Sequence, residues 1–204
     1  MKKLVFAFSV LMLCAAGTAQ KEAETAGSAT SLEERLATFM RLNEEMDLEG
    51  VMDYVYPKLF TIVPRNELLK AMKDAFNSEE VKVELDSMKV DKVYPVFEQE
   101  KGSYTKVTYS IVLIMDFNPS KDSIADKDDS QNELIRASMA EQFGEDNVSL
   151  DEVTGVLRVR TTSPMVAVKD ELSIEWTFLN LKEEDPMMNK LFSKEVLDKL
   201  ATYK

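Results

Sequence analysis

Several carboxylates and aromatic side chains lie beside apolar segments of the chain, where burial could make them reactive or able to bind a ligand. Buried Asp and Tyr side chains can exchange protons or hold a ligand by hydrogen bonds. The pocket candidates are Tyr54, Tyr109, Asp116 and Trp176, and Asp53 and Tyr56 lie in the same region as Tyr54. No two of them have a spacing typical of an active site, and aromatic residues on apolar strand faces are also common core residues. We therefore predict the four pocket candidates as ligand-binding residues and assign no catalytic residue.

The composition excludes several kinds of site. The chain has no histidine, which excludes a Ser-His-Asp or Cys-His nucleophile pair and a His-ligated zinc or haem site. The acidic stretch 122–133 invites a calcium interpretation. An EF-hand loop beginning at Asp126 would place Gln131 where a glycine is needed and Ala137 where a bidentate Glu is needed. A solvated loop leading into a helix fits better, and we expect no metal and no cofactor.

The charge balance bears on partners. There are 25 Lys and Arg residues against 37 Asp and Glu, a net charge of -12. Nucleic-acid binding depends on clustered basic residues, so we expect no nucleic-acid partner. A hydrophobic fraction of 45% with 30% charged residues is typical of a globular protein, and the length fits one domain with appendages.

Residues 1–19 have the three parts of an export signal. The basic pair Lys2-Lys3 precedes the apolar run Leu4–Cys14, and small residues at 17–19 predict cleavage before Gln20. The apolar run is shorter than the roughly 20 residues that span a membrane. We therefore expect an exported protein, periplasmic or extracellular, without a transmembrane segment.

Cys14 raises the alternative of a lipid anchor. A lipobox needs small residues before its cysteine, whereas Leu13 stands there. Plain cleavage after residue 19 is therefore favoured over lipoprotein anchoring at Cys14.

The apolar periodicity predicts one α+β domain over residues 31–204, after a flexible leader at 20–30. Ser31 and Glu34 form a capping box at the first helix. Helices are predicted over 31–46, 47–56, 64–76 and 130–143, with short helices starting near 185 and 193; strands are predicted over 81–96, 107–117, 148–150, 157–168 and 172–178. Strand 107–117 has the cleanest alternation and should be central in the sheet. The change of apolar parity around Pro164 predicts a bulge or break there.

Three helices, a meander of antiparallel strands and a closing strand with a Trp resemble the nuclear-transport-factor-2-like (NTF2-like) cone fold, also called SnoaL-like or cystatin-like. The resemblance is carried by residues 32–77 and 81–117, by Ser163–Val168 and by Ile174–Leu179. The chain also looks like small exported proteins of Bacteroidetes-type bacteria, mostly of unknown function. The resemblance implies N-terminal helices packed on a curved antiparallel sheet. The helix at 130–143 is extra to that fold.

Three functions remain open. The first is a non-catalytic exported module that binds a small apolar ligand or a protein partner. The second, which the resemblance implies, is an isomerase or dehydratase that uses an Asp/Tyr pair on an apolar carbonyl compound in the cone interior. The third is a structural role, in which a half-apolar strand face forms a homodimer interface. An open interior with converging polar atoms would favour the enzyme, whereas a filled apolar interior would favour the other two.

Overall fold

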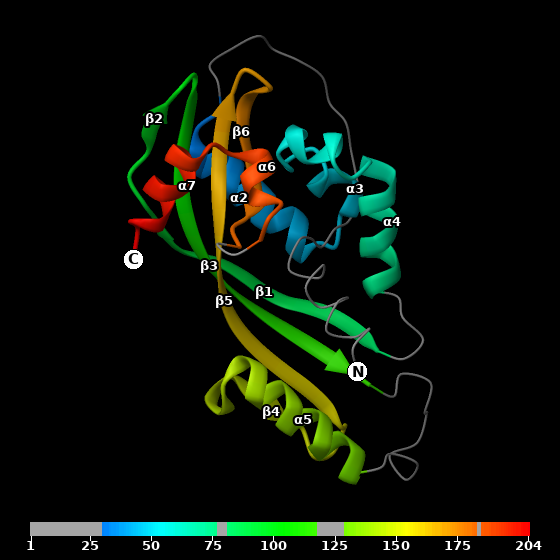
Figure 1. The fold of residues 1–204 in the computed structure, drawn as a ribbon. Coiled ribbons are helices and arrows are strands. Elements are labelled where there is room, and N and C mark those ends of the chain that lie inside the picture. Colours follow the sequence, from blue (N-terminus) through cyan, green and yellow to red (C-terminus); the bar gives the residue numbers. More distant parts are fainter. Residues whose placement is uncertain (1–29, 77–80, 118–128, 183–184) are drawn as a thin grey trace.

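The computed structural model describes residues 30–76, 81–117, 129–182 and 185–204 (Figure 1). Its helices are α2 (Leu32–Glu44), α3 (Leu48–Val51), α4 (Arg65–Phe76), α5 (Asp129–Phe143), α6 (Met188–Leu191), α7 (Lys194–Ala201) and the 3-10 helices η1 (Pro57–Thr61) and η3 (Glu145–Asn147). Its strands are β1 (Lys82–Val93), β2 (Phe97–Gln99), β3 (Gly102–Asp116), β4 (Val148–Leu150), β5 (Val156–Asp170) and β6 (Ser173–Asn180). This order confirms the predicted α+β class and the extra helix, α5, between strands β3 and β4.

The six strands that the structure describes form one antiparallel sheet. Its order is β1-β3-β5-β4, with β2 paired to β3 and β6 paired to β5. β3 lies between β1 and β5, as the alternation in 107–117 predicts. In Figure 1 the sheet curves along its length, with α2, α3 and α4 beside its upper part and α5 beside its lower end. The predicted helices on a curved antiparallel sheet are therefore confirmed.

Helix α2 begins at the predicted capping box. The Ser31 hydroxyl accepts from the Glu34 amide (3.2 Å), and the Glu34 carboxylate accepts from the Ser31 amide (2.9 Å). The helix buries one stripe of side chains at intervals of three and four residues: Leu32, Leu36, Phe39, Met40 and Asn43. Asn43 is tolerated there because its amide group donates to the Phe39 carbonyl (2.6 Å).

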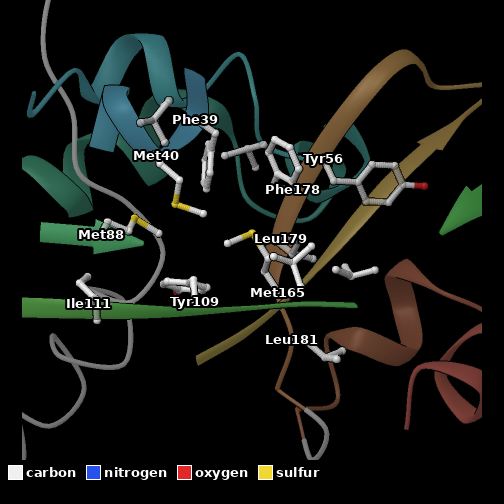
Figure 2. Close-up of a cluster of buried hydrophobic side chains, with 14 of the residues drawn as sticks. Phe39, Met40, Tyr56, Met88, Tyr109, Ile111, Met165, Phe178, Leu179 and Leu181 are labelled. Atoms are coloured by element: carbon white, nitrogen blue, oxygen red, sulfur yellow. The ribbon is translucent and has the colours of Figure 1, made fainter. Parts of the chain in front are cut away.

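The main core lies between α2 and the sheet (Figure 2). The rings of Phe39 on α2 and Phe178 on β6 have centroids 4.9 Å apart. The cavity beside them is lined by Phe39, Val55, Met165, Phe178, Leu179 and Asn180 and has a volume of only about 10 Å³. That is about the minimum for a single water molecule, so this part of the interior is filled by side chains.

The upper part of the sheet is covered on both faces. On β3, Val107 and Tyr109 are buried in the main core, whereas Tyr104 and Lys106 are buried on the opposite face, toward the C-terminal helices. There the Tyr104 ring meets Phe192 edge to face, and the Lys106 ammonium group donates to the Tyr203 carbonyl (2.9 Å). C-terminal residues thus form a second layer over the sheet.

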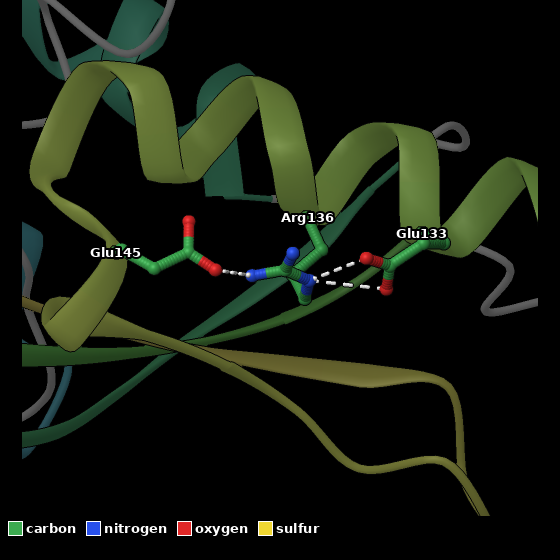
Figure 3. Close-up of polar contacts among 3 residues, drawn as sticks. All are labelled: Glu133, Arg136 and Glu145. Atoms are coloured by element: carbon green, nitrogen blue, oxygen red, sulfur yellow. Dashed lines mark hydrogen bonds and ion pairs between the residues drawn. The ribbon is translucent and has the colours of Figure 1, made fainter.

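Helix α5 is tied to the segment that follows it (Figure 3). The Arg136 guanidinium group donates to both oxygens of Glu133, at 2.8 and 3.0 Å, and to Glu145 in η3 at 2.6 Å. Met139 and Ala140 on the same helix are buried in the core. These contacts fix the turn from α5 into β4.

The predicted break at Pro164 is wrong. β5 pairs with β3 from Val156 to Lys169 without a register shift, and Pro164 lies opposite Thr108. The Pro164 carbonyl accepts from the Leu181 amide, just beyond the end of β6. In an antiparallel ladder the N–H and C=O of one residue point the same way, so the missing N–H of proline falls where the neighbouring strand has ended. The parity change instead reflects two-sided burial of this part of β5.

Strand β1 forms an edge of the sheet, because β3 is its sole neighbour among the described strands. Its pairing with β3 shifts register twice, between Leu85 and Ser87 and between Val90 and Lys92. Such irregularities increase the local twist of a strand. β1 is therefore neither flat nor uniformly paired.

The described residues also bear on the membrane and metal predictions. Within the described ranges, no helix has the length and apolar character needed to cross a membrane. In the same ranges, no group of three or more acidic, Cys or His side chains is placed to hold a metal ion. The predicted export signal and most of the acidic stretch 122–133 lie outside the described residues.

Candidate functional site

A cavity of about 380 Å³ lies where four separate segments meet, at the end of the sheet where β3 begins and β5 ends. It is lined by the start of η1 (Tyr56, Lys58), the β2–β3 turn with the first residues of β3 (Glu100, Lys101, Tyr104), the β5–β6 turn (Asp170, Glu171, Leu172) and the α6–α7 junction (Leu191, Phe192, Ser193). This volume is within the usual range of small-molecule sites.

Tyr56 is held at the cavity by backbone pairing. Its amide donates to the Phe178 carbonyl (3.1 Å), and the Phe178 amide donates to the Tyr54 carbonyl (2.7 Å), so this segment runs beside β6. Pro57 follows as the first residue of η1, where its fixed φ suits the start of a helix. The Tyr56 side chain is buried and its position is set by the main chain.

The Tyr56 hydroxyl donates to Asp170 Oδ2 at 2.6 Å. The other carboxylate oxygen of Asp170 accepts from the Leu172 amide at 2.9 Å, which closes the β5–β6 turn. Burial raises the pKa of Tyr56, and the hydrogen bond and negative charge of Asp170 raise it further. Tyr56 is therefore a neutral hydrogen-bond donor at any physiological pH.

Three aromatic rings form one wall of the cavity. Tyr56 stacks on Phe192, with ring centroids 5.4 Å apart and planes at 12°. Tyr104 meets Phe192 nearly perpendicularly, at 6.2 Å and 84°. Such geometries stabilise aromatic pairs beyond the area that they bury, so the wall is a rigid, packed surface.

Tyr104 contributes a hydroxyl that no side chain engages. Its side chain is 6% exposed, and among the described residues the Tyr104 hydroxyl has no hydrogen-bond partner. Burial and the negative charges of Asp170 and Glu100 raise its pKa, so the hydroxyl keeps its proton. The ring lies over Gly102, where a Cβ atom would approach the Tyr104 hydroxyl oxygen to 2.6 Å. A glycine is thus needed for Tyr104 to lie where it does.

The charged residues around the cavity differ in what they contact. Lys58 donates to the Leu191 carbonyl (2.7 Å), and Lys101 pairs with Glu171 (2.8 Å). Glu100, whose φ of 57° fits a tight turn, and Asp170 have no ion-pair partner among the described residues. Two carboxylates without an ion-pair partner among the described residues therefore lie in the same lining as Tyr104, and both act electrostatically on its hydroxyl.

The four predicted pocket residues do not line this cavity. Tyr54 lies beneath the Arg35 guanidinium group, 4.0 Å from the ring centroid. Tyr109 is buried and donates to Asn180 (2.9 Å). Trp176 is buried on β6, as expected of a core aromatic, and Asp116 is half-buried at the end of β3. Arg35 also donates to the Trp176 carbonyl (3.0 Å), so Tyr54 and Trp176 lie near each other. Tyr109 and Asp116 lie elsewhere on β3, and the four residues do not converge on one cavity.

The residues that do line the cavity gave little signal in the sequence. The sequence pattern singles out Tyr56 as a polar group near an apolar segment, but it does not single out Glu100, Tyr104, Asp170 or Phe192. One signal was present: the turn before β3 and the turn after β5 must lie at the same end of an antiparallel pair. Because Ser103 pairs with Lys169, Lys101 and Asp170 lie at the same end of this pair.

A second hollow, of about 430 Å³, lies on the outer side of the sheet near β4, lined by Ile114, Ser149, Leu150, Asp151, Thr154, Val156 and Arg158. Its lining has no aromatic residue. The Tyr56–Asp170 cavity is therefore the stronger candidate site.

Comparisons with protein families, with curated proteins and with solved structures give no match.

Proposed function

We propose that this protein is an exported, non-catalytic binding module with an NTF2-like fold, and that the Tyr56–Asp170 cavity is its ligand site. The observation that carries this proposal is the combination of a preformed cavity, a packed aromatic wall and an unengaged Tyr104 hydroxyl. Sites for small ligands typically combine apolar walls with a few fixed polar groups.

The arrangement of Asp170 favours binding over catalysis. Both carboxylate oxygens already accept hydrogen bonds, from the Tyr56 hydroxyl and the Leu172 amide. These two contacts give Asp170 a positioning role, since it holds the Tyr56 side chain and the β5–β6 turn in place. The pKa of the Tyr56 hydroxyl is raised further above neutral pH. The hydroxyl therefore does not give up its proton readily and is a poor acid or base.

One observation favours a second candidate function. The Tyr56–Asp170 pair is an Asp/Tyr pair beside an apolar wall, the combination that an isomerase or dehydratase would use on an apolar carbonyl compound. Turnover of such a compound that is lost in both Asp170→Asn and Tyr56→Phe, with folding intact, would replace the binding function by this one.

The binding site can be tested by blocking its mouth. Leu172 lines the cavity and is 56% exposed, so Leu172→Trp should fill the entrance without disturbing the core. A mixed set of cationic, anionic and neutral fragments is screened by amide NMR shifts of Lys101, Leu172 and Ser193. We expect fragments that shift these amides in the parent protein and lose binding in Leu172→Trp.

The matched control is Ile174→Trp, on the same hairpin at a position that is 82% exposed and does not line the cavity. It should bind the same fragments as the parent protein. If no fragment of any charge shifts the amides around the cavity, the binding function is wrong.

Export is supported by the pattern of residues 1–19. The intact mass of the protein recovered from the periplasm or medium should correspond to a chain that begins at Gln20, without an acyl group, because Leu13 spoils the lipobox. A diacylglyceryl group on Cys14 would show instead that the protein is a lipoprotein.

A further inference from the structure

We propose that the ligand of the Tyr56–Asp170 cavity is a small organic cation, an ammonium group on an apolar body. This inference rests on the proposed binding function and specifies its ligand class. Three features carry it: the local charges, the unengaged Tyr104 hydroxyl and the aromatic wall.

The local charges favour a positive ligand. Both lysines of the lining are already engaged: Lys58 by the Leu191 carbonyl, and Lys101 by Glu171. The carboxylates of Glu100 and Asp170 have no ion-pair partner among the described residues. The Lys101 charge is paired with Glu171, whereas the neutral carbonyl that accepts from Lys58 leaves the Lys58 charge in place, so the charged side chains of the lining sum to -1. This net negative charge favours a cation over an anion.

The Tyr104 hydroxyl marks the place where the ligand's polar group would sit. It is carried by a side chain that is 6% exposed, and Asp170 and Glu100 both act electrostatically on it. A ligand can form a hydrogen bond with this hydroxyl without breaking one inside the protein. An ammonium group can donate hydrogen bonds to the Tyr104 oxygen and to a carboxylate at once, because it carries three donors.

The aromatic wall fits the rest of such a ligand. Tyr104 and Phe192 present π surfaces and edges around the same cavity, and aromatic faces attract cations while their area binds apolar groups. Leu172 and Leu191 extend this apolar lining. The expected ligand is therefore an amine whose charged end reaches Glu100 and Tyr104.

Three probes of similar size test this ligand class: phenethylammonium, phenethyl alcohol and hydrocinnamate. Each is titrated at neutral pH into the full mature protein, and binding is measured by amide shifts of Lys101, Leu172 and Ser193. We expect phenethylammonium to bind roughly tenfold more tightly than the alcohol and hydrocinnamate to bind most weakly. Added salt should weaken the binding of the ammonium probe and leave that of the alcohol unchanged.

The test variant is Glu100→Gln, which removes one exposed carboxylate and keeps its shape. It should reduce affinity for phenethylammonium several-fold and leave affinity for the alcohol as it was. Glu152→Gln, on the exposed turn after β4 and away from the cavity, is the matched control and should change neither affinity.

The outcomes separate this inference from the function on which it rests. If hydrocinnamate or the alcohol binds as tightly as the ammonium probe at these amides, the cation preference is wrong and the binding function stands. A second result would lead to the same conclusion: fragments without a positive charge bind the parent protein and lose binding in Leu172→Trp, whereas phenethylammonium does not bind. If no compound of any charge moves the amides, the binding function fails as well.

Discussion

Phe178→Ala should lower the free energy of unfolding by about 3–5 kcal/mol, the usual cost of removing a large buried aromatic side chain. Phe178 is 1% exposed and packs on Phe39 of α2 at 4.9 Å. Its backbone also pairs with the Tyr54–Tyr56 segment. The substitution therefore leaves a cavity at the junction of the helices, the sheet and the segment that carries Tyr56.

The measurement is urea unfolding followed by the fluorescence of Trp176, the one tryptophan in the sequence. Ile174→Ala is the control on the same strand, since Ile174 is 82% exposed, and it should stay within about 0.5 kcal/mol of the parent protein. Equal stabilities for the two variants would show that β6 does not pack as described.

The stability of the protein should fall as the pH rises above about 10, the ordinary pKa of tyrosine. The pKa of Tyr56 is raised in the folded protein by burial and by Asp170, so the unfolded chain loses this proton first. The stabilisation is therefore complete below pH 10 and is lost above it, by up to about 1.4 kcal/mol for each pH unit. Tyr104, whose pKa is also raised, acts in the same direction.

Tyr56→Phe isolates the contribution of Tyr56. At neutral pH this variant should be less stable than the parent protein by about 1.5–3 kcal/mol, because a buried hydrogen bond to a carboxylate is lost. Above pH 10 the difference should shrink, since Phe has no proton to lose. The measurement is the free energy of unfolding in urea across this pH range. Parallel profiles for the two proteins would contradict the raised pKa of Tyr56.

Much of the fold is predictable from local patterns. The capping box of Ser31 and Glu34 marks the start of α2, and the alternation through 107–117 marks the central strand. These signals work because each depends on neighbours within a few residues. Pro164 misled the prediction because its tolerance depends on where β6 ends, which is a property of the assembled sheet.

The candidate site is not predictable in this way. Tyr56 and Asp170 are 114 residues apart in sequence and meet through strand pairing and the docking of η1. In the sequence Asp170 is typical of a turn residue and Tyr104 of an ordinary strand residue. Tyr109 and Trp176 have the stronger apolar surroundings, and the structure uses them in its core. Apolar periodicity reports burial, whereas a site depends on which buried groups converge.

The irregular edge strand β1 bears on how the protein behaves at high concentration. A flat, regular edge offers unpaired backbone groups to another chain and so promotes aggregation. Here two register shifts interrupt the strand, and exposed charged residues follow its length: Lys82, Glu84, Asp86, Lys89, Asp91 and Lys92. An added strand would find neither a continuous hydrogen-bond ladder nor an uncharged surface. The edge thus protects the protein from growing into larger sheets.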